Sequence, residues 1–204
     1  MFITFEGGEG SGKTTLIQAL KGFLMANEVD VITTREPGGS MIAEKIRQII
    51  LDLDNEGIKA KTEALLFAAS RIQHLEEVII PALKDHKIVL CDRYIDSSLA
   101  YQGYARGLGV DAVLNVNTFA LEYMPDITFY IDQAPEVGMS RIQSRVNNRL
   151  DLEKLDFHHK VREGYLALSK RYDKRYIIIN GNQSIEGVIE DVKAHLKDVP
   201  LWKK

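Results

Sequence analysis

The sequence predicts an α/β protein built around a mainly parallel sheet of five strands flanked by helices. Three observations indicate this fold class. β-prone and helical patterns alternate along the 204 residues, as is typical of parallel sheets whose strands are joined by helices. A glycine-rich motif separates the first strand from the first helix. The run Ile88-Val89-Leu90-Cys91 is apolar throughout, as expected of a strand buried on both faces.

Five short runs of β-prone residues are expected to form the sheet. In chain order they are residues 2–5, 29–34, 88–91, 127–131 and 176–180. The first reads Phe-Ile-Thr-Phe and the last reads Tyr-Ile-Ile-Ile-Asn. Such aromatic and β-branched residues favour strands. The fourth run follows Pro125, which ends the helical pattern before it.

The segments between these strands carry apolar residues at helical spacing. We expect one helix that begins at residue 14 and others over residues 40–51, 61–84, 111–122, 135–144, 155–171 and 184–197. Ser40 is a suitable N-cap, and Pro135 fits the first turn of a helix. Pro81 is expected to bend the long helix. Residues 143–151 are the least regular stretch and indicate a surface segment rather than a domain boundary.

The composition is that of one soluble domain, with a hydrophobic fraction of 45%, a charged fraction of 27% and a formal net charge of −3. Without an excess of positive charge, the chain is not expected to bind nucleic acid or an anionic membrane through a broad basic surface. The single cysteine, Cys91, excludes an intramolecular disulfide, and no apolar run approaches the length of a membrane span. We therefore expect a cytoplasmic protein with no nucleic-acid or membrane partner.

Residues 7–14 read Gly-Gly-Glu-Gly-Ser-Gly-Lys-Thr and match the phosphate-binding pattern G-x-x-x-x-G-K-[ST]. In a strand–turn–helix context, the glycines let backbone N–H groups point at phosphate oxygens, and the helix N-terminus adds partial positive charge. Lys13 would lie near the β and γ phosphates, and the Thr14 hydroxyl could hold Mg²⁺. The alternative is a chance match in a glycine-containing turn.

Two polar motifs directly follow expected strands. Asp92-Arg93-Tyr94 follows the third strand, and Arg35-Glu36-Pro37-Gly38-Gly39 follows the second. Ligands of open α/β sheets bind at the carboxyl ends of strands. At such a position Asp92 suits the water shell of Mg²⁺, and Arg35 and Arg93 suit phosphate. The alternatives are a surface Asp-Arg turn and a plain turn with a solvated arginine.

Phe67 and Arg71 are four residues apart in the long helix and therefore share one face. An aromatic ring with a forked donor beside it could stack on a base and read the carbonyl edge of that base. The alternative places Phe67 in the core and leaves Arg71 solvated.

These motifs occur in the order found in bacterial thymidylate kinases, which the chain resembles over nearly its whole length. The segments that carry the resemblance are residues 5–14, 35–39, 66–71, 92–94, 98–103, 147–151 and 180–184. The resemblance implies a three-layer P-loop kinase fold in a single domain, residues 1–204, with a short lid at about residues 141–152. It also implies a homodimer that transfers a phosphoryl group from Mg²⁺-ATP to dTMP, which serves dTTP synthesis.

The resemblance implies roles for individual residues. ATP would be bound by Gly7, Gly8, Glu9, Gly10, Ser11, Gly12, Lys13, Thr14, Thr15, Arg141, Asn182 and Gln183. The dTMP would be bound by Glu9, Arg35, Phe67, Arg71, Arg93, Ser98, Tyr101 and Gln102. Mg²⁺ would lie near Thr14 and Asp92. Gly8 stands where relatives often carry proline, and both residues are compatible with a turn.

The lid is expected to supply a catalytic arginine. Some thymidylate kinases carry that arginine in the phosphate loop, whereas residues 8–11 of this chain are Gly-Glu-Gly-Ser. An arginine near the transferring phosphoryl group is commonly a large catalytic term, and a helical lid would point Arg145 and Arg149 the same way. The alternative is that both are solvated lid charges. The residues expected to be catalytic are Lys13, Asp92, Arg93, Arg145 and Arg149.

Two other classes of function are compatible with the phosphate loop alone. A regulatory P-loop GTPase usually carries an Asn-Lys-x-Asp element, and the chain has no Asn-Lys dipeptide. A related kinase could instead act on another nucleotide or on a small alcohol. The residues that discriminate this second class are Phe67, Arg71, Ser98, Tyr101 and Gln102.

Overall fold

The computed structural model describes residues 1–142, 148–197 and 199. Within them lies a five-stranded sheet whose neighbouring strands all pair in parallel. The strands are β1 (Phe2–Gly7), β2 (Val31–Arg35), β3 (Ile88–Asp92), β4 (Ile127–Asp132) and β5 (Tyr176–Asn180). Their spatial order is β2-β3-β1-β4-β5, with β1 at the centre. The predicted fold class is confirmed, and each strand ends within two residues of its predicted bounds.

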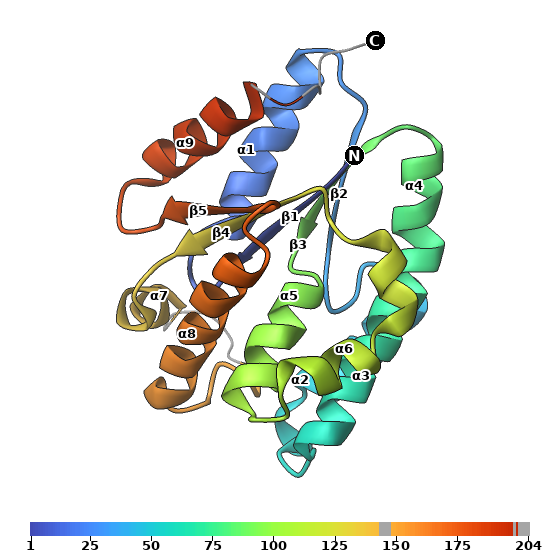
Figure 1. Cartoon of the computed structure of the whole chain (residues 1–204), viewed down its shortest axis with the longest axis vertical. Helices are drawn as coiled ribbons and strands as arrows, with labels where there is room; N and C mark the ends of the chain where they lie inside the picture. The colour runs from blue at the N-terminus through green and yellow to red at the C-terminus, as the bar shows by residue number, and fades with distance from the viewer. Residues whose placement is uncertain (143–147, 198, 200–204) are drawn as a thin grey trace.

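Helices cover both faces of the sheet (Figure 1). The α-helices of the described residues are α1 (Lys13–Ala26), α2 (Met41–Leu51), α3 (Ala60–His74), α4 (Ile80–Lys84), α5 (Ile95–Ser98), α6 (Val110–Asn115), α7 (Pro135–Ile142), α8 (Leu155–Arg171) and α9 (Ile185–Lys197). The remaining helical segments are the 3₁₀ turns η1 (Leu53–Asn55) and η4 (Thr118–Tyr123) and the π-helical turns η2 (Leu75–Ile79) and η3 (Leu99–Ala105). α1 and α9 lie against one face, and α5 and α8 lie against the other, which gives three layers.

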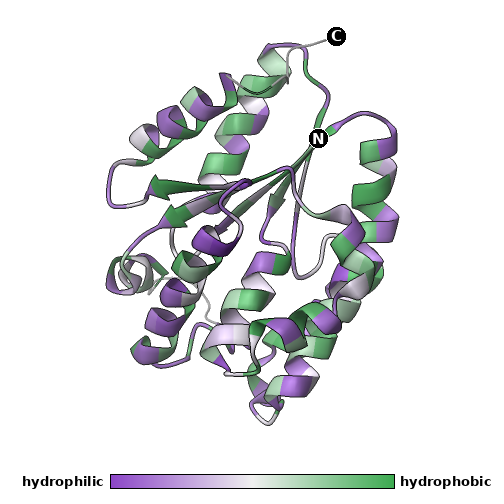
Figure 2. Ribbon diagram, in the orientation of Figure 1, coloured by the Kyte–Doolittle hydropathy of each residue, from purple (hydrophilic) through white to green (hydrophobic). Residues whose placement is uncertain are grey.

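Alternate residues of β1 fill the two interfaces between these layers, because strand side chains point to opposite faces in turn. Ile3 and Phe5 pack with Leu20 of α1. Phe2 points the other way and packs against Tyr94, with ring centroids 4.9 Å apart. Figure 2 shows mostly hydrophobic strands between helices of mixed character. Within the described part of the chain, none of the helices is long and apolar enough to cross a membrane.

The strand register brings three chain segments to one edge of the sheet. Asp92, at the end of β3, is the neighbour of Phe5 in β1 and of Arg35 in β2. β1 runs directly into the glycine-rich loop that precedes α1. The loop and the residues that follow β2 and β3 therefore meet at the carboxyl ends of adjacent strands, where open α/β sheets bind ligands.

Two predictions about helices need correction. The helix predicted over residues 111–122 is divided at Asn117, whose buried side chain turns inward and accepts a hydrogen bond from an arginine of α3. Ser40 occupies the predicted N-cap position of α2, but its side chain makes no capping hydrogen bond. The long helix predicted over residues 61–84 is present as α3, η2 and α4, and its π-helical interruption lies just before Pro81.

Residues 95–105 are helical, although no helix is predicted there. α5 and η3 follow each other without a gap. The spacing of the buried side chains Ile95 and Leu99 is the signal that indicates this helix. The wider π-helical turn of η3 sets the consecutive residues Tyr101 and Gln102 along one cavity wall.

Candidate active site

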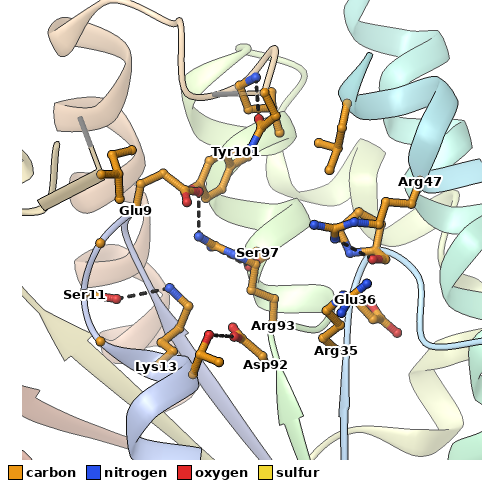
Figure 3. A pocket seen from close by; sticks show the side chains of 18 of the residues that line it. Glu9, Ser11, Lys13, Arg35, Glu36, Arg47, Asp92, Arg93, Ser97 and Tyr101 are labelled. Carbon is orange, nitrogen blue, oxygen red and sulfur yellow. Dashed lines mark hydrogen bonds and ion pairs between the residues drawn. The ribbon is translucent and has the colours of Figure 1, made fainter. Parts of the chain in front are cut away.

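The glycine-rich loop between β1 and α1 curls around the ammonium group of Lys13. The Lys13 Nζ donates to the carbonyls of Gly7 and Gly8 at 3.2 and 3.0 Å and to Ser11 Oγ at 3.1 Å (Figure 3). Gly12, at the N-cap of α1, has a φ of 84°, a left-handed conformation that favours glycine. The strand, loop and helix that a phosphate-binding motif requires are therefore all present.

The loop is braced by α7. A Cβ atom at Gly10 would lie 2.1 Å from the Gly138 carbonyl oxygen, and one at Gly138 would lie 2.0 Å from the Glu9 carbonyl oxygen. Only residues without a side chain allow this approach. Further along α7, Arg141 donates to the Gly10 carbonyl at 3.4 Å, which places an exposed cation beside the loop.

The environment of Lys13 suits an anion. Burial, followed by repulsion from the Arg93 guanidinium, lowers the pKa of Lys13 to about 8, against the opposite effect of the Asp92 carboxylate. A buried ammonium group beside another cation gains stability from a nearby negative charge. Phosphate oxygens would supply that charge.

Thr14 and Asp92 form a small oxygen cluster beside Lys13. Thr14 Oγ1 donates to Asp92 Oδ2 at 3.1 Å, and both residues line the same cavity. Mg²⁺ in kinase sites takes one or two protein oxygens and receives the rest from phosphate and water. A hydroxyl and a carboxylate therefore fit the predicted Mg²⁺ position. No group of three or more His, Cys, Asp or Glu side chains in the described ranges could hold a metal ion elsewhere.

The loop forms one end of a cavity of about 580 Å³. In Figure 3, Lys13 lies at the loop end and Arg35, Glu36 and Arg47 lie at the opposite end. Most of the predicted site residues line the cavity, namely Glu9, Gly10, Ser11, Gly12, Lys13, Thr14, Thr15, Arg35, Phe67, Asp92, Arg93, Tyr101, Gln102 and Arg141. Gly7 and Gly8 contribute through the carbonyls that hold the lysine.

Arg93 lies between the phosphate loop and the part of the cavity wall that carries Tyr101. Its φ of 69° turns the chain sharply after β3. Its Nη1 donates to the Gly7 carbonyl at 2.9 Å, and its Nη2 forms a 2.7 Å ion pair with Glu9. The guanidinium carbon lies 5.3 Å from the ring centre of Tyr101, whose hydroxyl also donates to Glu9, at 3.1 Å. One cation is thus shared by the phosphate loop and the wall that carries Tyr101.

A buried carboxyl group that sequence patterns do not single out, Glu6 of β1, lies behind Arg93. Glu6 accepts hydrogen bonds from Ser97 Oγ at 2.6 Å and from the Tyr165 hydroxyl at 2.8 Å. These same two oxygens accept from Arg93 Nη1 at 3.3 Å each. Burial, followed by repulsion from Asp96, raises the pKa of Glu6 to about 7. Glu6 therefore holds the groups that orient Arg93.

Two further arginines line the far end of the cavity. Arg35, the last residue of β2, pairs with Glu44 of α2 at 2.8 Å. Arg47, also on α2, donates to a backbone carbonyl of the preceding turn at 2.7 Å. Sequence reasoning missed Arg47, which lies four residues after the buried Ala43 and therefore on the same helix face. Together with Arg93, these cations suit a second phosphate group.

Phe67 of α3 gives the far end an apolar wall, with Leu51 and Leu150 beside it. It also belongs to a small buried cluster with Ile50 and Leu150. It is therefore a core residue that also reaches the cavity, and its stacking on a base stays a prediction. An aromatic ring on a cavity wall suits stacking on a flat base.

Arg71 and Ser98 do not line the cavity in this structure, and their contact with a base stays a prediction. Arg71 is 1% exposed and donates to Glu36, Asn117, the Tyr94 carbonyl and Ser98. The physical reason is that this guanidinium already compensates a buried carboxylate, at 2.8 Å from Glu36. Glu36 is the group that reaches the cavity wall, and Arg71 supports it from behind.

Residues 149–152 form a turn, so no helix of the described residues carries Arg149. Arg145 lies outside the described residues. Arg149 is buried, donates to the Ile50 carbonyl at 2.9 Å and forms a 2.6 Å ion pair with Glu63. It does not line the cavity. The structure therefore gives Arg149 internal partners, rather than solvent or a position beside the phosphate loop.

Asn182 and Gln183, predicted to contact ATP, lie in the turn between β5 and α9. Neither residue lines the cavity, and the Gln183 amide donates to Asp191 at 2.6 Å. The next helix begins at Ile185, whose Cδ1 would lie 3.2 Å from a Cβ atom at Gly12. The turn therefore borders the phosphate loop, and its contact with a nucleotide base stays a prediction.

Comparison with known proteins identifies the family. The family model described as thymidylate kinase matches residues 5–192. The chain belongs to the thymidylate kinase family. Proteins named thymidylate kinase from Clostridium novyi (strain NT) and Acholeplasma laidlawii (strain PG-8A) are 56% and 57% identical to it, and each alignment covers 96% of this chain and 98% of the relative. The crystal structure of thymidylate kinase from Ehrlichia chaffeensis has a TM-score of 0.78 and 34% identity, over 97% of this chain and 98% of that one.

These matches confirm the resemblance and show that the chain is an enzyme of the thymidylate kinase type. They also decide against the GTPase alternative.

Arg149→Ala is expected to destabilise this family member, because the Ile50 carbonyl loses its donor and Glu63 loses one of its two arginines. Breaking a buried ion pair costs about 3 kcal/mol, or roughly 6–12 °C in melting temperature for a chain of this size. Thermal unfolding followed by circular dichroism measures the shift, with the exposed Arg141→Ala as the control. A large loss of kcat at an unchanged melting temperature would instead support a catalytic role for Arg149.

Proposed function

We propose that the chain transfers the γ-phosphoryl group of ATP to dTMP, giving ADP and dTDP for dTTP synthesis. The observation that carries this proposal is a single cavity with two different ends. One end is a lysine-bearing phosphate loop, and the other has an aromatic wall and several arginines (Figure 3). These ends suit a nucleoside triphosphate and a nucleoside monophosphate, and family membership supports the same pair of substrates.

At the donor end, Lys13 and the backbone N–H groups of residues 9–15 would bind the phosphates of ATP. Incoming phosphate oxygens would replace the loop oxygens that now surround the Lys13 ammonium. Thr14 and Asp92 would hold Mg²⁺, which neutralises charge on the phosphate oxygens when it is bound. Residues from two neighbouring elements would complete the site, namely Arg141, Asn182 and Gln183.

At the acceptor end, Phe67 would stack on thymine and Gln102 would contact the edge of the base. Tyr101 would pack beside the sugar. Glu9, which accepts a hydrogen bond from the Tyr101 hydroxyl at 3.1 Å, would face the hydroxyl of the sugar. The cations that would hold the acceptor phosphate are Arg35, Arg47 and Arg93. Arg71 and Ser98 would support the wall from behind, through the contacts described above.

The chemistry requires little beyond positioning and charge. The acceptor phosphate is largely dianionic at neutral pH, so its oxygen can attack the γ-phosphorus without a general base while the bond to the ADP oxygen breaks. Arg93 contacts the phosphate loop and the ring of Tyr101, from where it would stabilise charge that moves between the two phosphates. Arg145 or Arg149 would supply a second such contact from the lid, Arg149 only after leaving Glu63.

We also propose a cytoplasmic homodimer, as the family resemblance implies. Large apolar side chains are exposed on α2 and η4, including Met41 at 74% and Phe119 at 78%. A second copy of the chain that covered them would remove apolar surface from water.

The proposed function predicts that dTMP is the preferred acceptor. A coupled ADP-release assay with ATP and Mg²⁺ measures kcat/KM for dTMP, dCMP, dAMP and dGMP. We expect the value for dTMP to exceed each of the others by about a hundredfold or more, and EDTA to abolish turnover until Mg²⁺ is restored. Faster turnover of a purine nucleotide or of a small alcohol would favour the related-kinase alternative instead.

A further inference from the structure

A buried carboxylate that does not itself line the cavity lies behind the wall that carries Gln102. Glu63, in the first turn of α3, is 1% exposed. Its Oε1 accepts from Gln102 Nε2 at 2.9 Å and from Arg106 Nε at 3.2 Å. Its Oε2 accepts from Arg106 Nη2 at 3.2 Å and from Arg149 Nη2 at 2.6 Å. Of its three partners, only Gln102 lines the cavity.

We propose that Glu63 is a positioning residue that determines base selectivity by fixing which end of the Gln102 amide faces the acceptor nucleotide. The inference rests on the proposed function and deepens it, since it concerns how the same site distinguishes one pyrimidine from another.

The first step is the ionisation of Glu63. Burial alone would raise the pKa of this carboxyl group, but hydrogen bonds from Arg106, Gln102 and Arg149 outweigh it and leave the pKa below its ordinary value. Glu63 is therefore a carboxylate and can only accept hydrogen bonds.

The second step is the orientation of Gln102. An amide presents an NH₂ donor at one end and an oxygen acceptor at the other. Because Glu63 cannot donate, the NH₂ end must face it. Among the residues that the structure describes, none donates to Gln102 Oε1. Since Gln102 lines the cavity, its oxygen is the end left for a ligand.

The third step concerns the base. Thymine carries an N–H at ring position 3, which can donate to the Gln102 oxygen. Cytosine carries a lone pair at the same position, so two acceptors would face each other and a buried hydrogen bond would be missing. Without Glu63 the amide could turn over and present its NH₂ end, which suits cytosine. The Glu63 carboxylate thus favours the thymine pattern of donors without contacting the base.

Glu63→Gln tests this mechanism, because the introduced amide can either donate or accept and no longer fixes Gln102. The readout is the ratio of kcat/KM for dTMP to that for dCMP, and we expect it to fall about tenfold or more. Glu153→Gln is the matched control. Glu153 pairs with the same Arg106, at 2.6 Å, and the change is chemically identical, but Gln102 is not among its partners. The ratio for E153Q is expected to stay within about twofold of wild type.

A double-mutant cycle separates positioning from a general structural effect. If Glu63 acts through the amide, E63Q in a Gln102→Leu background should leave the dTMP/dCMP ratio unchanged. An equal loss of turnover for both nucleotides in E63Q, or an unchanged ratio in folded E63Q, would overturn the inference. Wild-type enzyme that does not phosphorylate dTMP would overturn the proposed function instead, before any variant is compared.

Folding is checked by thermal unfolding of each variant. Should E63Q show no cooperative transition, Glu63→Asp keeps the negative charge between the two arginines but shortens the side chain by one methylene. The shorter carboxylate is drawn away from Gln102, so E63D is also expected to lower the dTMP/dCMP ratio. An unchanged ratio in folded E63D would count against the inference as directly as the same result in E63Q.

Discussion

Lys13→Ala is expected to lower kcat for dTMP phosphorylation about a hundredfold or more while the fold stays intact. The Lys13 ammonium is held by three oxygens of the phosphate loop, at the end of the cavity where the γ-phosphate of ATP would lie. Removing one preorganised contact to developing charge costs roughly 3 kcal/mol. Steady-state kinetics and thermal unfolding measure the two effects. Lys87→Ala is the matched control, since Lys87 precedes β3 at the opposite edge of the sheet and pairs with Asp85.

The pH dependence gives the Lys13 assignment a second check. With its pKa near 8, Lys13 in the free enzyme loses its proton as the pH rises through that value. Because kcat/KM reports ionisations of the free enzyme, kcat/KM for ATP should fall above about pH 8 in wild type, and this limb should disappear in K13A. Turnover of K13A within about threefold of wild type would contradict the assignment of the phosphate loop.

Arg93→Lys is expected to lower kcat/KM for dTMP by about two orders of magnitude. Lysine keeps the charge but loses the planar fork that joins the Gly7 carbonyl to the Glu9 carboxylate. Both residues would share the left-handed φ of 69°, so the variant isolates the geometry of the side chain from the strain of the backbone. Kinetics at fixed saturating ATP give the measurement, with the exposed Arg171→Lys as the control.

If Arg93 holds the acceptor phosphate, the R93K variant should change the kinetic parameters for dTMP and for ATP by different amounts. The loss should fall mainly on kcat and on KM for dTMP, with a smaller change in KM for ATP. A variant in which only KM for ATP rises would place Arg93 at the donor end alone. Its contacts with Tyr101 and with the Glu6 network would then serve the fold rather than the acceptor.

The elements whose bounds could be predicted are those set by local pattern. The helix over residues 155–171 and the strand over residues 176–180 agree with the structure at both ends. Each is flanked by clear changes in periodicity, so neighbouring residues contain the information. The break at Asn117 could not be predicted in this way, because it depends on a hydrogen bond to Arg71, which is 46 residues away in the chain.

The candidate site divides along the same line. The phosphate loop, Asp92 and Arg93 are marked by short motifs at strand ends, and the structure brings them together. The partners of Arg71 and Arg149 could not be predicted in this way, because a sequence shows an arginine but not the buried carboxylate that pairs with it. Glu36 and Glu63 are those carboxylates, each more than 30 residues away from its arginine. A buried polar network is therefore the part of a site that local sequence patterns describe least.

β1 and β3 are hydrogen-bonded neighbours within the sheet, with Phe5 in register with Asp92. The groups proposed for the donor phosphates and for the acceptor phosphate thus leave the sheet about one strand spacing apart, or about 4.8 Å. This separation is maintained by backbone hydrogen bonds of the molecular interior. Such bonds typically open only in global unfolding, whereas surface loops fluctuate at much lower cost. Catalytic alignment in this chain is thereby coupled to the global free energy of unfolding, and not to the local equilibria of its loops.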